Sequence, residues 1–330
     1  MILSQIFLTI KYILLVITGL IIITIIYSLW DNNRIIVIQQ EVQIENLPPE
    51  FENYKILLLS DLHGKRFGES QQYITRLIND LDYDVIVIAG DSQDNKTEGI
   101  APLLELLNGI DRQTPIFYVA GNNGPFDSVI ETGEILEDGQ TLQTEGVSLM
   151  TLPVQIEKGE HHIWFVPYFS YQQAIGQQDL AQEGSKTSQN GSESTFYERM
   201  LNHQEELQQA FEAINNEEVM ICVTHEPLLP QRLDEPINLP VYDLVLAGHY
   251  HGGQYRLPFI GPIFLWGIPS EYHGFFPGDT FISGLYIGKS IQQYISRGLG
   301  ASGFIPMQKF RLFNTPEINL IILTNMVHSD

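Results

Sequence analysis

The sequence has little cysteine and few basic residues. Its 330 residues include one cysteine, Cys222, so no intrachain disulfide can form and a disulfide-stabilised scaffold is excluded. Lysine and arginine number 17 against 40 acidic residues, which gives a formal net charge of −23. Because proteins bind nucleic-acid backbones through clustered Lys and Arg, we expect no nucleic-acid partner.

Apolar residues are abundant by contrast. They make up 44% of the chain, which includes 17 Phe and 15 Tyr, so intrinsic disorder is also excluded. The length is enough for one large or two small domains with a proper core.

An uncharged apolar stretch runs from Tyr12 to Trp30, and about 20 such residues span a bilayer as a helix. A cleaved signal peptide has a shorter apolar region that ends in small residues, whereas this one ends in Tyr-Ser-Leu-Trp. Residues 1–31 are therefore predicted to be an uncleaved membrane anchor, the alternative being a buried core helix. Lys11 before the stretch gives a slight preference for a single-pass chain with its body outside the cytoplasm.

Residues 32–330 are predicted to form one body, in which short apolar runs alternate with polar or helical stretches. Five runs are typical of strands buried on both faces: Lys55–Ser60, Asp84–Ala89, Pro115–Ala120, Val219–Thr224 and Tyr242–Ala247. Further strands are expected at Arg34–Ile44, Thr280–Gly288, Gln292–Arg297 and Ile318–Thr324, and helices at Ser70–Leu81, Thr97–Ile110 and Phe196–Ile214. The pattern indicates a layered, mixed α/β body. Residues 172–194, rich in Gln, Ser and Gly, are predicted to be a surface insertion.

Each of the five central runs ends in side chains that can bind a metal ion, mostly beside glycine. They are Asp61 and His63, Asp91, Asn122, His225, and His249 with His251. In open α/β sheets ligands bind at the carboxyl ends of strands, so we expect these side chains to converge. Such ligands suit Mn²⁺, Fe²⁺ or Zn²⁺, and two ions about 3.5–4 Å apart can stabilise both the attacking and the leaving oxygen of a phosphoryl displacement.

Taken singly, these motifs also have ordinary structural interpretations. Asp61 can cap a strand, Asp91 and Asn122 can belong to turns, and a histidine before proline can be a buried core residue. The pair His249 and His251, flanked by glycine, is the strongest single signal. The metal site is inferred from all five motifs together, because each one follows a predicted strand.

Together, the motifs D-x-H, G-D-x-x-D, G-N, T-H-x-P and G-H-x-H-G-G-Q resemble the calcineurin-like metallophosphoesterase family, especially its membrane-anchored bacterial branch. The likeness extends from about residue 55 to 324 and includes Ser296–Gly300 and Arg311–Phe313. The resemblance implies a two-sheet α/β sandwich flanked by helices and two divalent metal ions (Mn, Fe or Zn). It assigns one ion to Asp61, His63 and His251, the other to Asn122, His225 and His249, with Asp91 shared. It also implies attack on phosphorus by a metal-bridging hydroxide.

Asn123 departs from the family pattern. The family usually has histidine at this position, where it protonates the leaving group or steadies the phosphate. Asparagine can donate a hydrogen bond to phosphate but no proton, and general acid catalysis contributes typically about 10²–10⁴-fold. Hydrolysis of a pyrophosphate bond is slowed less by the missing general acid, because its leaving group is a stable anion. The alternative is that Asn123 only completes a turn.

The sequence thus predicts a metal-dependent phosphoesterase acting on a phosphomonoester, phosphodiester or pyrophosphate. The anchor and the apolar segment Arg256–Gly278 favour a membrane-associated lipid or nucleotide-lipid substrate, although that segment can equally belong to the core. Asn123 motivates an alternative, a membrane-anchored binding module that keeps its metal ions but has lost turnover. A metal-dependent amidohydrolase is disfavoured by the motif order, and the sequence indicates no obligate protein partner.

Overall fold

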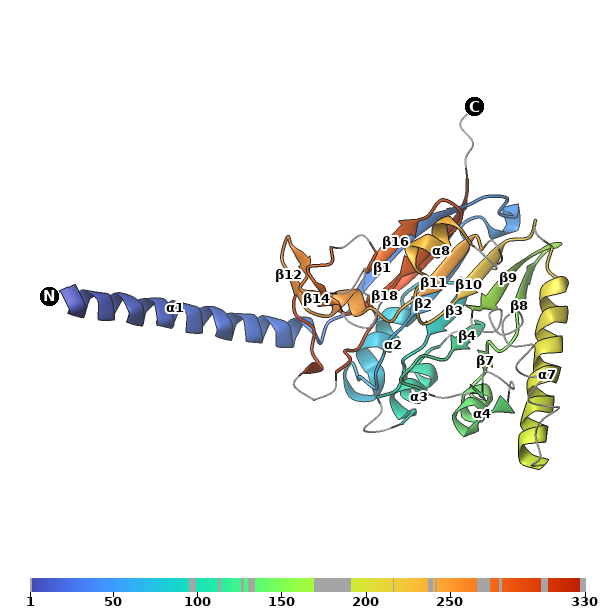
Figure 1. The fold of residues 1–330 in the computed structure, drawn as a ribbon, viewed down its shortest axis with the longest axis horizontal. Helices are drawn as coiled ribbons and strands as arrows, with labels where there is room; N and C mark the ends of the chain where they lie inside the picture. The colour runs from blue at the N-terminus through green and yellow to red at the C-terminus, as the bar shows by residue number, and fades with distance from the viewer. Residues whose placement is uncertain are drawn as a thin grey trace.

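The computed structural model has two six-stranded sheets packed face to face, helices on their outer faces, and one long N-terminal helix that extends away from the body (Figure 1). It describes residues 2–94, 99–111, 114–125, 128–129, 134–168, 191–215, 217–236, 240, 242–265, 274–278, 281–303 and 308–326.

The N-terminal helix α1 (Ile2–Asp31) is the one helix among the described residues that is long and apolar enough to cross a membrane. Its apolar side chains are exposed along most of its length; Leu15 is 60% exposed and Ile23 is 64% exposed. This exposure excludes the buried core helix that the sequence left open. Figure 1 shows α1 projecting from the body as a separate rod.

The first sheet joins the two ends of the body. Its order is β1 (Ile36–Ile44), β18 (Glu317–Asn325), β2 (Lys55–Leu59), β3 (Val85–Ala89), β4 (Ile116–Val119) and β7 (Val147–Leu149). All neighbours are parallel except β18 and β2, which pair antiparallel with Leu320 opposite Leu57. The last strand of the chain therefore lies between the first two.

The second sheet is also mixed. Its order is β16 (Gly284–Ile287), β17 (Gln292–Ile295), β11 (Leu244–Ala247), β10 (Met220–Val223), β9 (His161–Pro167) and β8 (Val154–Lys158). The four central strands are parallel, and the edge strands β16 and β8 are antiparallel to their neighbours. The carboxyl ends of the central strands of both sheets carry the candidate ligands.

Helices cover the outer face of each sheet. The first sheet packs against α2 (Gln72–Asn79), α3 (Ala101–Asn108) and α4 (Glu137–Thr144), and the second against α7 (Gly191–Glu212) and α8 (Pro230–Asp234). Short 3₁₀ turns are η1 (Pro49–Phe51), η2 (Glu69–Gln71) and η3 (His251–Gly253). Small two-stranded pairs are β5 (Ser128–Val129) with β6 (Glu134–Ile135), β12 (Arg256–Leu257) with β13 (Gly261–Pro262), and β14 (Phe264–Leu265) with β15 (Gly274–Phe275).

The continuous apolar runs arise because each central strand is buried on both faces. In β2, Ile56 and Leu58 point into the core between the sheets, whereas Leu57 and Leu59 pack against the helices outside. A strand with two covered faces has no position for a polar side chain until it ends. The polar residues therefore gather at the strand tips.

The predicted layered α/β body of two mixed sheets is confirmed. Strands or helices occur at every predicted segment, with shorter bounds in most cases; β7, β8, β9, α4, α8 and the small two-stranded pairs were not predicted. Of the predicted insertion at 172–194, residues 172–190 lie outside the described part of the chain, and α7 begins at Gly191. The division at residue 31 stays a prediction.

Candidate metal centre

The candidate ligands follow strands of both sheets and meet at one end of the sandwich. Asp61, Asp91 and Asn122 follow β2, β3 and β4 of the first sheet, and His225 and His249 follow β10 and β11 of the second. The backbone N–H of His249 donates to both carboxylate oxygens of Asp61, at 3.1 Å each, and so joins the tips of the two sheets. The convergence expected from the sequence is present.

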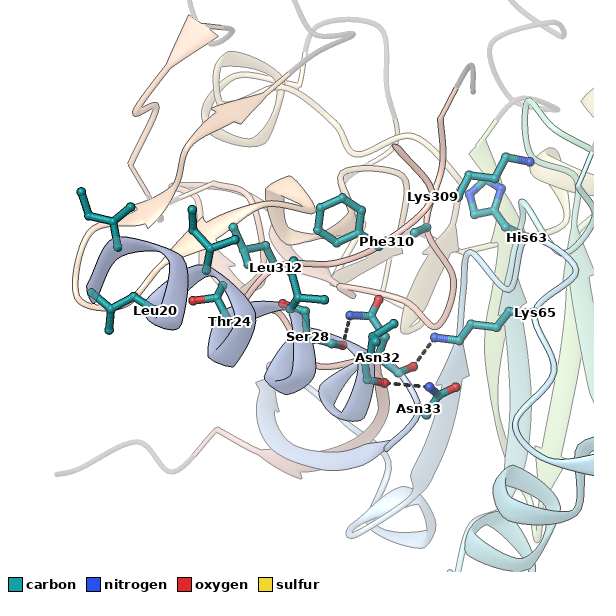
Figure 2. A pocket seen from close by; sticks show the side chains of 15 residues that line it. Leu20, Thr24, Ser28, Asn32, Asn33, His63, Lys65, Lys309, Phe310 and Leu312 are labelled. Carbon is teal, nitrogen blue, oxygen red and sulfur yellow. Dashed lines mark hydrogen bonds between the residues drawn. The ribbon is translucent and has the colours of Figure 1, made fainter. Parts of the chain in front are cut away.

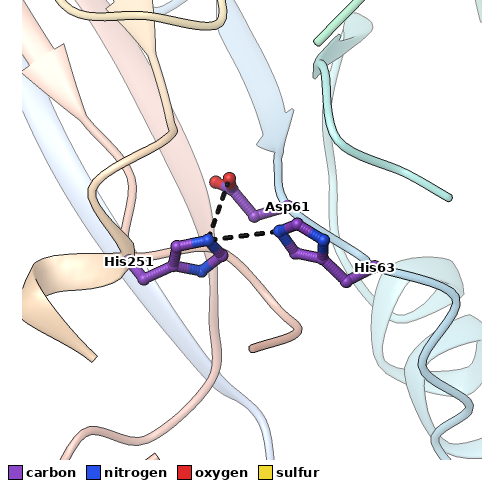
Figure 3. Close-up of side chains that lie close together, drawn as sticks. All are labelled: Asp61, His63 and His251. Carbon is purple, nitrogen blue, oxygen red and sulfur yellow. Dashed lines mark hydrogen bonds and ion pairs between the residues drawn. The ribbon is translucent and has the colours of Figure 1, made fainter. Parts of the chain in front are cut away.

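One cluster contains Asp61, His63 and His251 (Figure 3). The Nε2 atom of His251 lies 3.2 Å from Nε2 of His63 and 3.6 Å from Oδ1 of Asp61. All three residues are buried. These distances allow one ion to contact a ligand atom of each residue.

A second cluster is centred on Nε2 of His225. This atom lies 3.1 Å from Oδ1 of Asn122 and 3.1 Å from Nδ1 of His249. The Nδ1–H of His225 donates to the carbonyl oxygen of Ala89 at 3.0 Å, which leaves the lone pair of Nε2 directed into the cluster. Backbone hydrogen bonding thus selects the tautomer that a metal ligand needs.

Asp91 reaches both clusters. Its Oδ2 atom lies 3.5 Å from Nε2 of His63, and its Oδ1 atom lies 3.3 Å from Nε2 of His225. Asp91 therefore belongs to both clusters.

The amide of Asn122 provides a test of whether a cation fits. Its Oδ1 atom lies 2.9 and 3.0 Å from the two oxygens of Asp91 and 3.1 Å from Nε2 of His225, and it accepts one hydrogen bond, from Nδ2 of Asn123 at 3.1 Å. Converging acceptors repel one another unless a cation lies between them, and only the oxygen of this amide can bind a metal ion. Turning the amide over would replace that repulsion with hydrogen bonds, but it would remove the ligand atom. The donor set fits divalent cations.

Three of the candidate histidine ligands are held neutral. Burial lowers the pKa of His63 to about 4 and that of His249 to about 4, and it lowers the pKa of His251 well below its ordinary value. Neutral imidazole is the form that binds metal ions, so these side chains are ready as ligands at pH 7.

The two carboxyl groups and His225 behave differently. Burial raises the pKa of Asp61. Burial also opposes ionisation of Asp91, but hydrogen bonding with His225 and Asn123 and the positive charge of His225 hold its pKa below the ordinary value. Burial lowers the pKa of His225, yet Asp91 and Asp61 raise it overall to about 9. The carboxylates therefore attract positive charge to this position, and a proton and a metal ion compete for it.

The backbone at five candidate ligands is in the left-handed region, which sequence patterns do not reveal. The φ angles are 52° at Asp61, 47° at His63, 47° at Asp91, 73° at His249 and 50° at His251. Each such angle costs a non-glycine residue about 1–2 kcal/mol. Strain of this kind concentrates at functional sites, where the surrounding structure maintains it.

Glycines beside the ligands are explained by close approach. A Cβ atom at Gly121 would lie 2.2 Å from Oδ1 of Asp91, and one at Gly248 would lie 2.5 Å from Oδ2 of Asp61. Both distances are shorter than any real contact. Glycine at these positions allows the strand tips to meet.

A cavity of about 450 Å³ opens beside the centre and is lined by Asp91, Asn122, Asn123 and His249 among others. Asn123 therefore stands where a substrate phosphate could reach it, and it also contacts Asp91. Its predicted contact with phosphate stays a prediction.

Arg311 is a residue whose role the sequence did not predict, although it belongs to the quoted motif Arg311–Phe313. Its guanidinium is fully buried: Nε donates to the carbonyl oxygen of Gly300 at 2.6 Å, and Nη2 lies 3.3 Å from Nδ1 of His251. The backbone N–H of Arg311 donates to Oδ1 of Asn32 at 2.7 Å, just beyond α1. Arg311 thus joins the end of the N-terminal helix to the metal centre.

The fold is a layered α/β sandwich whose strand tips carry a donor set that suits divalent metal ions. Residues 54–253 match the family model described as calcineurin-like phosphoesterase. The chain belongs to the calcineurin-like phosphoesterase family, whose members are metal-dependent phosphoester hydrolases.

Relatives come from both animals and bacteria. A Bos taurus protein named "Transmembrane protein with metallophosphoesterase domain" is 26% identical over 86% of this chain and 56% of that protein. The Bacillus subtilis (strain 168) protein named "Uncharacterized metallophosphoesterase YkuE" is 25% identical over 84% of this chain and 81% of that protein. The chain thus spans little more than half the length of the bovine relative. A dimetal phosphatase from Danio rerio aligns over 75% of this chain and 88% of its own with a TM-score of 0.34 and 11% identity.

Proposed function

We propose that the chain hydrolyses phosphate esters or phosphoanhydrides with two divalent metal ions, Mn²⁺, Fe²⁺ or Zn²⁺. Family membership supports the reaction class. The observation that carries the dinuclear assignment is the position of Asp91, with one oxygen 3.5 Å from His63 and the other 3.3 Å from His225.

Two groups of side chains would hold the ions. The first is Asp61, His63 and His251, the second is Asn122, His225 and His249, and Asp91 belongs to both. When bound, the ions supply an activated water nucleophile and positive charge for the phosphate oxygens. Two carboxylates among otherwise neutral ligands leave the site positive overall, so it accepts an anionic phosphate despite the net charge of −23 of the chain.

Asn123 influences which substrates react fastest. Its amide can steady a phosphate oxygen but carries no proton to give to a leaving group. We therefore expect faster turnover of bonds whose leaving group is a stable anion, such as the phosphate released from a pyrophosphate bond.

A single-pass membrane anchor is the function proposed for α1, with the body outside the cytoplasm. The end of the helix is built into the body, as expected for a segment that remains attached: the Tyr27 ring stacks on Phe313 at 5.2 Å, and Oγ1 of Thr315 donates to Oδ1 of Asp31 at 2.7 Å. Protease digestion of intact cells tests the orientation, because an external body is cleaved while an internal one is protected.

The first experiment measures metal-dependent turnover by the full chain in detergent. The protein is loaded with Mn²⁺ and assayed with bis-p-nitrophenyl phosphate and p-nitrophenyl phosphate, while its metal content is determined by mass spectrometry. Asp91→Ala should abolish turnover, whereas Glu157→Ala, an exposed carboxylate on β8, should not.

The second candidate function is a binding module without turnover, which Asn123 favours. It predicts bound metal and no hydrolysis of either ester. Hydrolysis that disappears in Asp91→Ala and persists in Glu157→Ala would exclude it. Metal bound at full occupancy without hydrolysis would overturn the enzymatic proposal.

A further inference from the structure

A groove of about 820 Å³ lies between one face of α1 and the body (Figure 2). Leu20, Thr24 and Ser28 line it from α1 at intervals of four residues, which places them on one face of the helix. Phe310 and Leu312 line the opposite wall. The groove is therefore mainly apolar.

The inner end of the groove reaches the metal centre. His63 lines the groove, and its Nε2 atom lies 3.2 Å from Nε2 of His251. A molecule in the groove can thus extend to a candidate metal ligand.

Two lysine side chains lie at this inner end. Lys65 and Lys309 line the groove beside His63. Lys65 donates to the carbonyl oxygen of Asn32, and Lys309 pairs with Asp94. In a chain with a net charge of −23, two lysines at the head of an apolar groove suit an anionic headgroup with an apolar tail.

The length of the groove matches one leaflet of a bilayer. Its α1 lining extends from Ile17 to Leu29, about 18 Å along the helix axis at the usual helical rise. One leaflet contributes about 15 Å of hydrocarbon, and the headgroup lies beyond it. Because α1 is itself suited to span the membrane, the groove lies within reach of lipid from the leaflet beside the body.

Exposed apolar side chains lie on the same side of the body as α1. Phe259 is fully exposed and Ile260 is 59% exposed between β12 and β13, and Phe275 is 75% exposed in β15. Figure 1 shows these small strand pairs near the C-terminal end of α1. Exposed apolar side chains such as phenylalanine are stabilised when they enter the boundary between headgroups and acyl chains, so this rim would hold the mouth of the groove against the bilayer.

We propose that the groove binds the hydrocarbon tail of a membrane lipid whose headgroup carries the scissile phosphoester. The tail lies along Leu20, Thr24 and Phe310, and the phosphate enters the metal centre past His63 and Lys65. This inference rests on the proposed phosphoesterase function and names its substrate class.

A series of substrates with one reacting bond tests the tail site. The full chain, loaded with Mn²⁺ in mixed micelles of fixed composition, is assayed with the methyl, octyl and hexadecyl esters of p-nitrophenyl phosphate. All three release p-nitrophenolate, so differences in kcat/KM report binding of the alkyl chain. We expect kcat/KM to rise at least about tenfold from methyl to hexadecyl, since each buried methylene is favourable.

A substitution that fills the groove distinguishes binding of the alkyl tail in the groove from partition of the substrate into the micelles. Thr24→Trp should lower the ratio of hexadecyl to methyl kcat/KM about tenfold. Ile23→Trp, at a neighbouring position that is 64% exposed and outside the groove lining, should keep the wild-type ratio. Equal ratios in all three proteins would overturn the tail site and leave the phosphoesterase function intact.

If none of the esters is hydrolysed, the result contradicts the proposed phosphoesterase function and says nothing about the tail site. A direct binding measurement then tests the tail site. Hexadecyl phosphate with a photoreactive diazirine in the middle of its tail should crosslink to Phe310 or Leu312 in the wild type and in Ile23→Trp, but not in Thr24→Trp. Absence of these adducts in the wild type, or equal adducts in Thr24→Trp, would overturn the proposal.

Discussion

Asn123 donates a hydrogen bond to each carboxylate oxygen of Asp91. Its backbone N–H donates to Oδ1 at 2.7 Å and its side-chain Nδ2 donates to Oδ2 at 2.7 Å. Both bonds favour the ionised carboxylate, and they contribute to holding its pKa below the ordinary value against the effect of burial. Asparagine at this position therefore orients the ligand that both clusters share.

Asn123→Ala should weaken metal binding. The backbone hydrogen bond remains, but the side-chain bond to Oδ2 of Asp91 is lost, and removal of a partner that orients a metal ligand typically costs about 10–100-fold in metal affinity or activity. Titration of the full chain with Mn²⁺ against a chelator measures the affinity. Gln155→Ala, which removes an exposed amide on β8, is the matched control and should bind as the wild type does. Unchanged affinity in Asn123→Ala would show that the bond has no positioning role.

Asn123→His should change the dependence of rate on the leaving group. An imidazole next to Asn122 can give a proton to the departing oxygen, an effect worth typically about 10²–10⁴-fold. We expect the gain for alkyl phosphates, whose leaving groups are strong bases, and little gain for p-nitrophenyl esters. The measurement is kcat/KM across phosphodiesters of graded leaving-group pKa: a shallower slope supports this role, and parallel slopes refute it.

Gly121→Ala should disrupt the metal centre without unfolding the body. The added Cβ would lie 2.2 Å from Oδ1 and 2.3 Å from the backbone nitrogen of Asp91, so the shared ligand must move. We expect loss of bound Mn²⁺ and at least about a 100-fold loss of turnover, read by metal analysis and ester hydrolysis. Gly146→Ala is the control, because its φ of 81° costs about 1–2 kcal/mol in stability but no atom lies near its Cβ. Equal metal content in the two variants would contradict the steric argument.

The sequence predicted the strands and the chemistry of their tips for one physical reason. Strands buried on both faces must be apolar until they end, so Asp61, Asp91 and Asn122 stand out against uniform runs. What could not be predicted depends on contacts between distant segments. The left-handed backbone at the ligands is set by surrounding packing, and the bond from Asn123 to Asp91 joins loops of two neighbouring strands.

The groove beside α1 was beyond prediction for the same reason. The sequence gives α1 its length and apolarity, but the opposite wall comes from Phe310 and Leu312 near the other end of the chain. Hydrogen bonds between Asn32 and Arg311 fix the two segments together. No periodicity within α1 indicates such a partner, because its apolar residues surround the helix on every side.

A pH-dependent contribution to stability is expected from Asp243, which lies far from the metal chemistry at the start of β11. Burial and the charge of Glu45 raise its pKa to about 6, although backbone N–H groups, including that of Met220 at 2.7 Å, partly oppose the shift. A raised pKa in the folded state means that the protonated form stabilises the fold. This contribution is complete below the ordinary pKa of 3.8 and is lost as the pH rises through about 6.

Asp243→Asn should therefore stabilise the protein at neutral pH. The amide oxygen can still accept the hydrogen bond from Met220, but the buried charge is gone. The gain should be on the order of 2 kcal/mol at pH 7.5, allowing for the partial exposure of the side chain, and should nearly vanish at about pH 3.5, where the carboxyl is mostly protonated in both the folded and the unfolded state. Thermal unfolding of both full chains in detergent with a chelator measures the difference, since any pH effect of the shared metal centre cancels between them. A difference in Tm that is the same at both pH values would exclude titration of Asp243 as its cause.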